Sequence, residues 1–199
     1  MSRRALKIDP KSVFLNVPFD KKYEQIFIGI VVGLVTLGLK PRSVIEIPEQ
    51  GQGRMDRLFN LIRTCGASIH DLSRVGSPAR FNMPFELGLA FSLKQMTGQH
   101  FFALFETKKY RLDRTLSDLK MIDPKIHGGN GQRALQCVYE SFKPYGHPAP
   151  TEQGQKIYRY LVRDIKGLRQ RRETIFNPIA FEALITRALL LKLHVHKLA

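Results

Sequence analysis

The chain has 199 residues, enough for one compact domain with an appendage or for two small units, and enough to bury a core without disulfides or metal. Its two cysteines lack a CxxC or Cys/His spacing, which argues against a disulfide framework and a zinc site, and its longest apolar run, residues 26–39, is shorter than the roughly 20 residues of a membrane span. The formal net charge of +15 favours a negatively charged partner, which could be nucleic acid, a nucleotide or an acidic protein.

The positive charge is spread along the chain and becomes denser toward its end. Residues 1–106 carry a net charge of +5, residues 107–150 of +4 and residues 151–199 of +6. The two arginines near the N-terminus are not followed by an apolar segment, so we expect no signal peptide. We therefore expect a reduced, cytoplasmic protein that attracts polyanions and does not enter a membrane.

Strands and helices alternate through the first half of the predicted structure. Apolar and β-branched runs predict strands, and runs of amphipathic or wholly apolar character predict helices. The predicted strands are buried throughout their length, which is typical of a parallel sheet that helices cover on both faces. The expected strands are residues 12–17, 43–47, 67–71 and 100–105, and the expected helices are residues 23–37, 54–64 and 83–95.

The second half of the chain has a weaker pattern. Residues 108–132 are polar and rich in turn residues, and residues 134–142 predict a helix. We divide the chain into an α/β domain over 1–142, a linker or strap over 143–153, and a basic helical region over 154–199. In the last region we expect helices over 154–173 and 178–194, the second with Asn177 as N-cap and Pro178 as its first residue.

Glu86 is the first candidate for a catalytic residue. It is the only acidic residue between Asp71 and Glu106, in the apolar segment RFNMPFELGLAFSLK. We expect the apolar residues beside it to be buried, Phe85 and Phe91 among them, and Gly88 to allow close approach by another group. Asn82 is expected to cap this helix and Pro84 to lie in its first turn, which puts Glu86 near the positive end of the helix dipole. Ligands of parallel sheets bind at the carboxyl ends of the strands, so we expect Glu86 and Asp71 to open toward one crevice there. A helix-capping role for Glu86 is the alternative.

Three segments resemble a known superfamily. FELGLAFSL resembles the glutamate-bearing helix F-E-L-G-x-A-x-A-L of nucleoside 2-deoxyribosyltransferase-like proteins, and ASIHDLS is similar to their A-D-x-V-x-A-x-x-D segment. SVFLNVPFDKKYEQIF resembles the first strand and loop of that group and of the related TIR domains. The segments NVPFD and RFNMPFELGL bring the chain closest to bacterial TIR-like proteins of antiviral defence loci. The resemblance covers residues 12 to about 106 and implies a flavodoxin-like or TIR-like fold.

The resemblance also implies a chemistry. A helix glutamate of these enzymes attacks or stabilises the anomeric carbon while an N-glycosidic bond breaks, and Glu86 matches that glutamate. Asp71 matches the acid that contacts the base. NAD or a nucleotide would be the substrate or ligand, no cofactor is implied, and the protein is expected to self-associate. KQMTGQHFFAL replaces the usual G-K-P that follows the helix, and a Trp-Cys pair before the glutamate is missing, so deoxyribosyl transfer is not implied.

Further residues are candidates for nucleotide binding. Some belong to the loop after the first strand, and the alternative for these is a plain turn in which Asp20 is the helix N-cap. The others could hold phosphates, and the alternative for these is that they are ordinary solvated side chains. These residues are Asn16, Pro18, Phe19, Asp20, Arg54, Ser73, Arg74, Arg80 and Asn82.

Two other segments and two other functions stay open. IHGGNG, residues 126–131, is a candidate lid or a bare turn, and KGLRQRR, residues 166–172, is a candidate site for nonspecific nucleic-acid contact. The histidines show no metal-ligand spacing. Beside the glycosidase, the alternatives are a noncatalytic nucleotide sensor or scaffold of a defence complex, and a nonspecific nucleic-acid-binding protein.

Overall fold

A computed structural model describes most of the chain. The described residues are 7–47, 53–74, 81–119, 122–145, 150–170 and 174–194, without the side chains of residues 145 and 166–170. Arg80, residues 48–52 of the loop after the second strand, and the side chains of the basic segment 166–172 lie outside this description.

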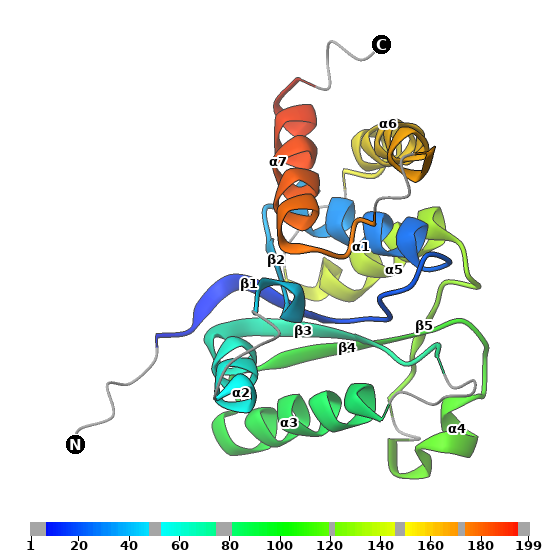
Figure 1. Cartoon of the computed structure of the whole chain (residues 1–199). Coiled ribbons are helices and arrows are strands. Elements are labelled where there is room, and N and C mark those ends of the chain that lie inside the picture. The colour runs from blue at the N-terminus through cyan, green and yellow to red at the C-terminus, as the bar shows by residue number, and fades with distance from the viewer. Residues whose placement is uncertain are drawn as a thin grey trace.

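Five parallel strands form the central sheet, in the order β2-β1-β3-β4-β5 (Figure 1). This is the flavodoxin-like order, in which the direction of winding reverses between β1 and β3, and it confirms the predicted parallel α/β fold. Asn16, at the end of β1, pairs with His70 of β3 at that point of reversal. The strands are β1 (Asp9–Asn16), β2 (Lys40–Ser43), β3 (Cys65–Asp71), β4 (Phe101–Glu106) and β5 (Lys125–Ile126).

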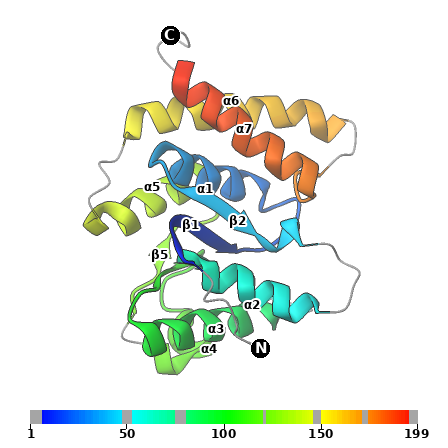
Figure 2. The same cartoon turned by 90° about the vertical axis from the view of Figure 1, so that its left-hand side faces the viewer.

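Helices cover both faces of the sheet (Figures 1 and 2). One face carries α1 (Glu24–Thr36) and α5 (Gly131–Phe142), and the other carries α2 (Arg54–Thr64) and α3 (Asn82–Thr97). The short α4 (Leu112–Thr115) lies next to the start of α3. Two long helices, α6 (Thr151–Gln170) and α7 (Pro178–His194), form an outer layer over α1. Among the described helices, none has both the length and the apolar character that a membrane span requires.

The largest part of the core surrounds α1. This helix is apolar around its whole circumference because the sheet, α5, α6 and α7 all pack against it. Glycines permit the close approach of these helices: a Cβ at Gly29 would collide with the carbonyl of Gly131, and a Cβ at Gly131 would collide with the hydroxyl of Tyr158. The outer helices are therefore part of the same core as the sheet.

The start of α7 confirms the predicted N-cap. The Asn177 side-chain oxygen accepts a hydrogen bond from the Ala180 amide at 2.9 Å, and Pro178 is the first helical residue. The other end of α7 touches α1, where the Lys192 ammonium donates to the Val35 carbonyl at 3.1 Å. The Val35 carbonyl also accepts from the Gly38 amide at 3.0 Å, so Lys192 adds a second hydrogen bond there and places a positive charge at the negative end of the α1 dipole.

The second strand was predicted at the wrong position. It occupies Lys40–Ser43, and Val44–Glu46 form a 3-10 turn. The turn is fixed by a capping box, in which the Glu46 carboxylate accepts from the Ser43 amide at 2.7 Å and the Ser43 hydroxyl accepts from the Ile45 amide at 3.4 Å. This local hydrogen bonding outweighs the β-propensity of the SVIEI segment.

Two further boundaries differ from the prediction. The third strand was expected to begin at residue 67, but Cys65 and Gly66 are the first residues of β3. Gly66 is needed there because a Cβ would lie 2.7 Å from the Cα of Pro10 on the neighbouring strand. The short strand β5 was not predicted, since its two residues stand in a segment that is otherwise polar and rich in turns.

Candidate active site

A cavity of about 230 Å³ opens at the carboxyl edge of the sheet, on the face that carries α2 and α3. The end of β1, the turn after β2, and the first residues of α2 and α3 enclose it. Nine of the thirteen lining side chains are apolar and four are polar or charged, and polar and apolar surface face the cavity in similar amounts. The lining residues are Leu15, Asn16, Val17, Phe19, Val44, Ile47, Arg54, Met55, Leu58, Asn82, Met83, Phe85 and Glu86.

Glu86 is the only acidic residue among the described residues that line this cavity. It is the fifth residue of α3 and is 8% exposed. Burial raises the pKa of its carboxyl to about 7, although the positive charge of Arg54 acts in the opposite direction. Within the described part of the chain its carboxylate makes no hydrogen bond and no ion pair. A buried acid without such partners is unusual outside functional sites.

The helix-capping interpretation of Glu86 does not fit the start of α3. The N-cap is Phe81, and no side chain caps the helix. The first turn holds no acidic residue, because Glu86 lies just beyond it. Asn82, which was expected to be the cap, is itself the first helical residue and lines the cavity.

Two expectations about the surroundings of Glu86 are wrong. Phe85 and Phe91 were expected to be buried, but both are exposed, because α3 covers the sheet with one face and turns the other to solvent. Gly88 was expected to allow close approach by another group, yet no atom lies within 4 Å of a Cβ built there. The apolar residues of α3 are therefore not all core residues.

Asn16 ties the floor of the cavity to the start of α3. Its side-chain amide donates to the carbonyl of Met83 at 2.7 Å and to Nδ1 of His70 at 2.9 Å. His70 Nδ1 must then be the unprotonated nitrogen, so Nε2 carries the proton and donates to the Ser68 hydroxyl at 2.8 Å. Burial, with the nearby His100 as a second cause, lowers the pKa of His70 to about 3, which agrees with this neutral form.

The hydrogen-bond chain that begins at Asn16 and His70 continues through Ser68 to His100. The Ser68 hydroxyl bonds Nε2 of His100 at 2.9 Å, and Nδ1 of His100 donates to the Cys65 carbonyl at 3.1 Å. All three side chains are buried. This chain was not predicted, because polar residues on a strand give no sign of their partners on the next strand. It holds Asn16, and through it the first turn of α3, in a fixed position.

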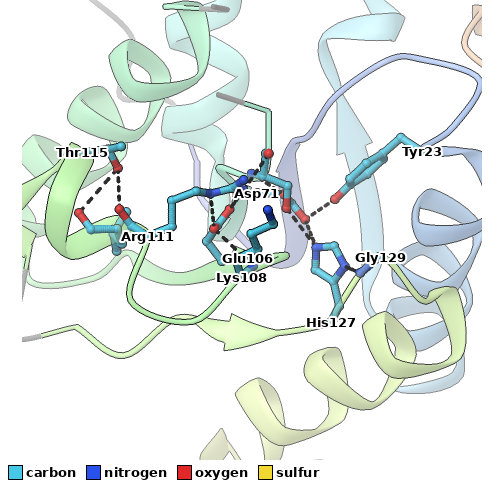
Figure 3. Close-up of polar contacts among 10 residues, drawn as sticks. Tyr23, Asp71, Glu106, Lys108, Arg111, Thr115, His127 and Gly129 are labelled. Atoms are coloured by element: carbon cyan, nitrogen blue, oxygen red, sulfur yellow. Dashed lines mark hydrogen bonds and ion pairs between the residues drawn. The ribbon is translucent and has the colours of Figure 1, made fainter. Parts of the chain in front are cut away.

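Asp71 occupies a separate cluster and does not line the cavity (Figure 3). Its Oδ1 accepts from the Ser73 amide at 2.9 Å, and its Oδ2 accepts from the Tyr23 hydroxyl and from Nε2 of His127 at 2.8 Å. Burial alone would raise the pKa of Asp71, but the hydrogen bonds, led by that of His127, bring the pKa below its ordinary value. The expectation that Asp71 and Glu86 share one crevice is therefore wrong.

The Asp71 cluster is not a catalytic triad. The hydroxyl of Ser73 lies 3.1 Å from Nε2 of His127, the same nitrogen that bonds Asp71, whereas a triad needs the two partners on different nitrogens. Nδ1 of His127 accepts from the Gly129 amide at 3.1 Å (Figure 3). The IHGGNG segment is thus a turn that anchors a buried histidine.

The other predicted nucleotide-binding residues fall into two groups. Asn16, Phe19, Arg54 and Asn82 line the cavity with Glu86, whereas Pro18, Asp20, Ser73 and Arg74 do not. Asp20 and Arg74 form an ion pair at 2.7 Å that joins the loops after β1 and β3. Asp20 also accepts from the Tyr23 amide at 3.1 Å, but α1 begins only at Glu24, so it caps the preceding turn and not the helix.

Ser73 is held from a second side by the end of β4. The Arg111 guanidinium donates to the Ser73 carbonyl at 2.6 Å and forms an ion pair with the buried Glu106 (Figure 3). The loop after β3 therefore starts from fixed polar contacts, and those contacts lie away from the cavity.

Sequence reasoning missed most of the apolar wall. Val44, Met55 and Leu58 follow β2 or belong to α2, and nothing in their own segments indicated a cavity. The one feature that could have identified them is their position, because each follows the carboxyl end of a strand or lies near the start of the next helix, where ligands of parallel sheets bind.

Comparison with protein-family models and with curated proteins found no match for this chain. In the described part of the structure, no group of three or more His, Cys, Asp or Glu side chains could hold a metal ion. The case for a function depends on the geometry of the cavity and on the motifs of the sequence.

Proposed function

We propose that this protein cleaves the N-glycosidic bond of a nucleotide such as NAD, with Glu86 facing the anomeric carbon. One observation carries the proposal: a buried glutamate, without hydrogen-bond or ion-pair partners among the described residues, lines a cavity at the edge of a flavodoxin-like sheet. The resemblance of FELGLAFSL to the glutamate helix of known glycosidic-bond enzymes supports the same role.

The transition state explains why such a carboxylate is useful. As the bond between the sugar and the base breaks, positive charge develops on the anomeric carbon and the ring oxygen. A carboxylate that is largely withdrawn from water, as Glu86 is, stabilises that charge more strongly than it would in water. The developing cation in turn favours the ionised form of Glu86. Addition of water to the sugar carbon and loss of one proton then complete hydrolysis.

The composition of the cavity favours a substrate with a cationic base. A neutral purine needs a proton before it leaves, and the described lining has no acidic side chain besides Glu86. Nicotinamide, by contrast, is positively charged in NAD and leaves as a neutral molecule with the electron pair of the broken bond. A single carboxylate is enough for that departure.

The volume of the cavity sets a limit on what enters it. Binding sites for drug-sized ligands have volumes of about 300–1,000 Å³, and this cavity is smaller. It suits one nucleoside unit, so the rest of a dinucleotide would extend beyond it. Arg54 lines the cavity from the first turn of α2, where a guanidinium and a helix N-terminus both favour phosphate.

The test is chromatography of reaction mixtures. Concentrated protein is incubated with NAD, with nicotinamide mononucleotide and with neutral nucleosides, and the free bases are separated and measured. We expect nicotinamide release by the wild type, loss of at least about 100-fold in rate for Glu86→Gln, and little release from neutral nucleosides. Glu140→Gln, on the outer surface of α5, is the matched control. Equal rates for wild type and Glu86→Gln would refute the proposal.

The position of Asp71 favours a second candidate, a noncatalytic nucleotide sensor. The acid that would contact the base by resemblance is withdrawn into its own hydrogen-bond cluster. A sensor would bind NAD in calorimetry but form no product under any condition. Binding should then weaken for Arg54→Ala, since that side chain lines the same cavity.

A further inference from the structure

The outer helix α7 is apolar on two opposite sides. One side, which includes Phe181, Leu184 and Ala188, is buried against α1. On the opposite side, Ile179 is 81% exposed, Leu190 is 51% exposed and Leu193 is 74% exposed. The two exposed residues between them, Ala183 and Thr186, complete a line that we call the α7 stripe. Single exposed leucines are common, but a continuous line along a whole helix is not.

The spacing of the α7 stripe is that of a coiled-coil seam. Ile179, Ala183, Thr186, Leu190 and Leu193 follow one another at intervals of four, three, four and three residues. Such a repeat keeps every member on one line that faces a partner helix. The small side chains in the middle, Ala183 and Thr186, let the partner approach closely, and the large side chains lie at both ends.

Charges on the two flanks of the α7 stripe are complementary. Glu182 borders it on one side and Arg187 on the other, five residues later. In a parallel pair of helices with this repeat, a residue at the Glu182 position faces the residue five positions further along the partner. A second copy of the same helix would therefore bring Glu182 opposite Arg187 twice, once on each side of a two-fold axis.

The existing ion pair of Arg187 does not prevent this contact. Arg187 bonds Asp164 of α6 within the chain, and about half of its side chain stays exposed. A guanidinium has five N–H donors, so it can hold a second carboxylate on its open side.

We infer that the α7 stripe is a homodimer interface, in which two α7 helices pack in parallel about a two-fold axis. A helix of 17 residues is about 25 Å long, which is short for the roughly 800 Å² per partner of a stable interface. The apolar groove of about 370 Å³ between α6 and α7 lies beside the stripe and would add to the contact. Because each copy also carries a net charge of +15, we expect a micromolar dimer and not an obligate one.

This interface is independent of the proposed catalytic site. The helix α7 lies over α1 on one side of the sheet, whereas the cavity is on the side of α2 and α3 (Figure 1). Dimerisation would leave both cavities open. Failure of the dimer would therefore not affect the glycosidase proposal, and failure of the glycosidase would not affect the dimer.

Sedimentation velocity of the full chain tests the inference, at concentrations from about 1 to about 200 µM and near-physiological salt. We expect reversible dimerisation of the wild type. Leu190→Glu and Leu193→Glu should each weaken it by roughly 100-fold or more, because a charge would be buried in the seam. Met96→Glu, at an equally exposed position on α3, should change nothing. Circular dichroism checks that each variant is folded.

A charge swap tests the parallel arrangement. In an Asp164→Asn background, which removes the intrachain partner of Arg187, Glu182→Arg should weaken the dimer because it places Arg opposite Arg, and adding Arg187→Glu should restore it. A wild type that stays monomeric at the highest concentration would overturn the inference. So would a dimer that withstands Leu190→Glu, since another face would then carry it. A double swap that fails to restore association would overturn the parallel geometry.

Discussion

Replacement of Glu86 by glutamine should stabilise the protein above about pH 4.5, with the full effect above about pH 7. The pKa of this carboxyl is about 7 in the folded chain against 4.5 for an ordinary glutamate. Below about pH 4.5 the group is protonated in both the folded and the unfolded state, so it does not lower the free energy of unfolding. As the pH rises from 4.5 to 7 the unfolded state ionises first and the folded state loses stability. Above pH 7 the loss is complete.

The expected size of this loss follows from the same two values. Their difference of 2.5, multiplied by 1.36 kcal/mol per pKa unit, gives about 3 kcal/mol in the free energy of unfolding. For a chain of this length, that corresponds to a melting temperature about 6–12 °C higher for Glu86→Gln at alkaline pH. Catalytic residues are selected for activity and often destabilise the fold. Removal of a catalytic Glu86 should therefore make the protein more stable.

The assay is urea unfolding of wild type and Glu86→Gln across a pH series from about 4.5 to about 8.5. The difference in unfolding free energy should be close to zero at the acid end and should reach a plateau above neutrality. Glu140→Gln, which removes an exposed carboxylate on α5, should show no such rise. A Glu86→Gln difference that is the same at both ends of the series would refute the reasoning, because the buried carboxyl would then titrate as it does in the unfolded chain.

Three more predictions follow from contacts described above. The rate of base release should rise with pH through about 7 in a steady-state profile, because the ionised form of Glu86 is the active one; a rate that falls over this range would assign it the role of an acid. Gly131→Ala should cost more than about 2 kcal/mol in denaturant unfolding, since its Cβ would collide with Tyr158, whereas Gly88→Ala, in open space on α3, should be neutral or stabilising. Asp71→Asn should lower the unfolding free energy by about 3 kcal/mol while the folded fraction keeps its activity; loss of activity at full stability would return this residue to the catalytic site.

The fold was largely predictable because buried segments of the chain consist mainly of apolar residues. The strands of this sheet are covered on both faces, so β4 is an apolar run and β1 contains one, and α1 is apolar around its circumference for the same reason. The exception is β2, where the Ser43–Glu46 capping box shapes a segment whose composition favours a strand. Side-chain hydrogen bonds of this kind depend on geometry that composition does not encode.

The candidate site was predictable in part. Glu86 stood out because a charged residue interrupts an apolar segment, which is a property of that segment alone. The position of Asp71 depends on Tyr23 and His127, which are far from it in sequence, so no local pattern could show that its carboxylate is already occupied. For the same reason the His70–Ser68–His100 chain and the apolar wall of the cavity became visible only in three dimensions.

The arrangement of α1 beneath α7 has a consequence for how this protein is made. Phe27 of α1 packs on Phe181 of α7, with ring centres 5.6 Å apart, and Lys192 bonds the end of α1. Translation produces α1 early, but the last part of its cover, α7, emerges only after some 140 further residues. Until then the nascent chain exposes the part of α1 that α7 covers, and exposed apolar surface of this kind promotes aggregation. A premature stop codon before Pro178 would make the exposure permanent, so such a truncated product should aggregate although its sheet and its candidate catalytic residues are all present.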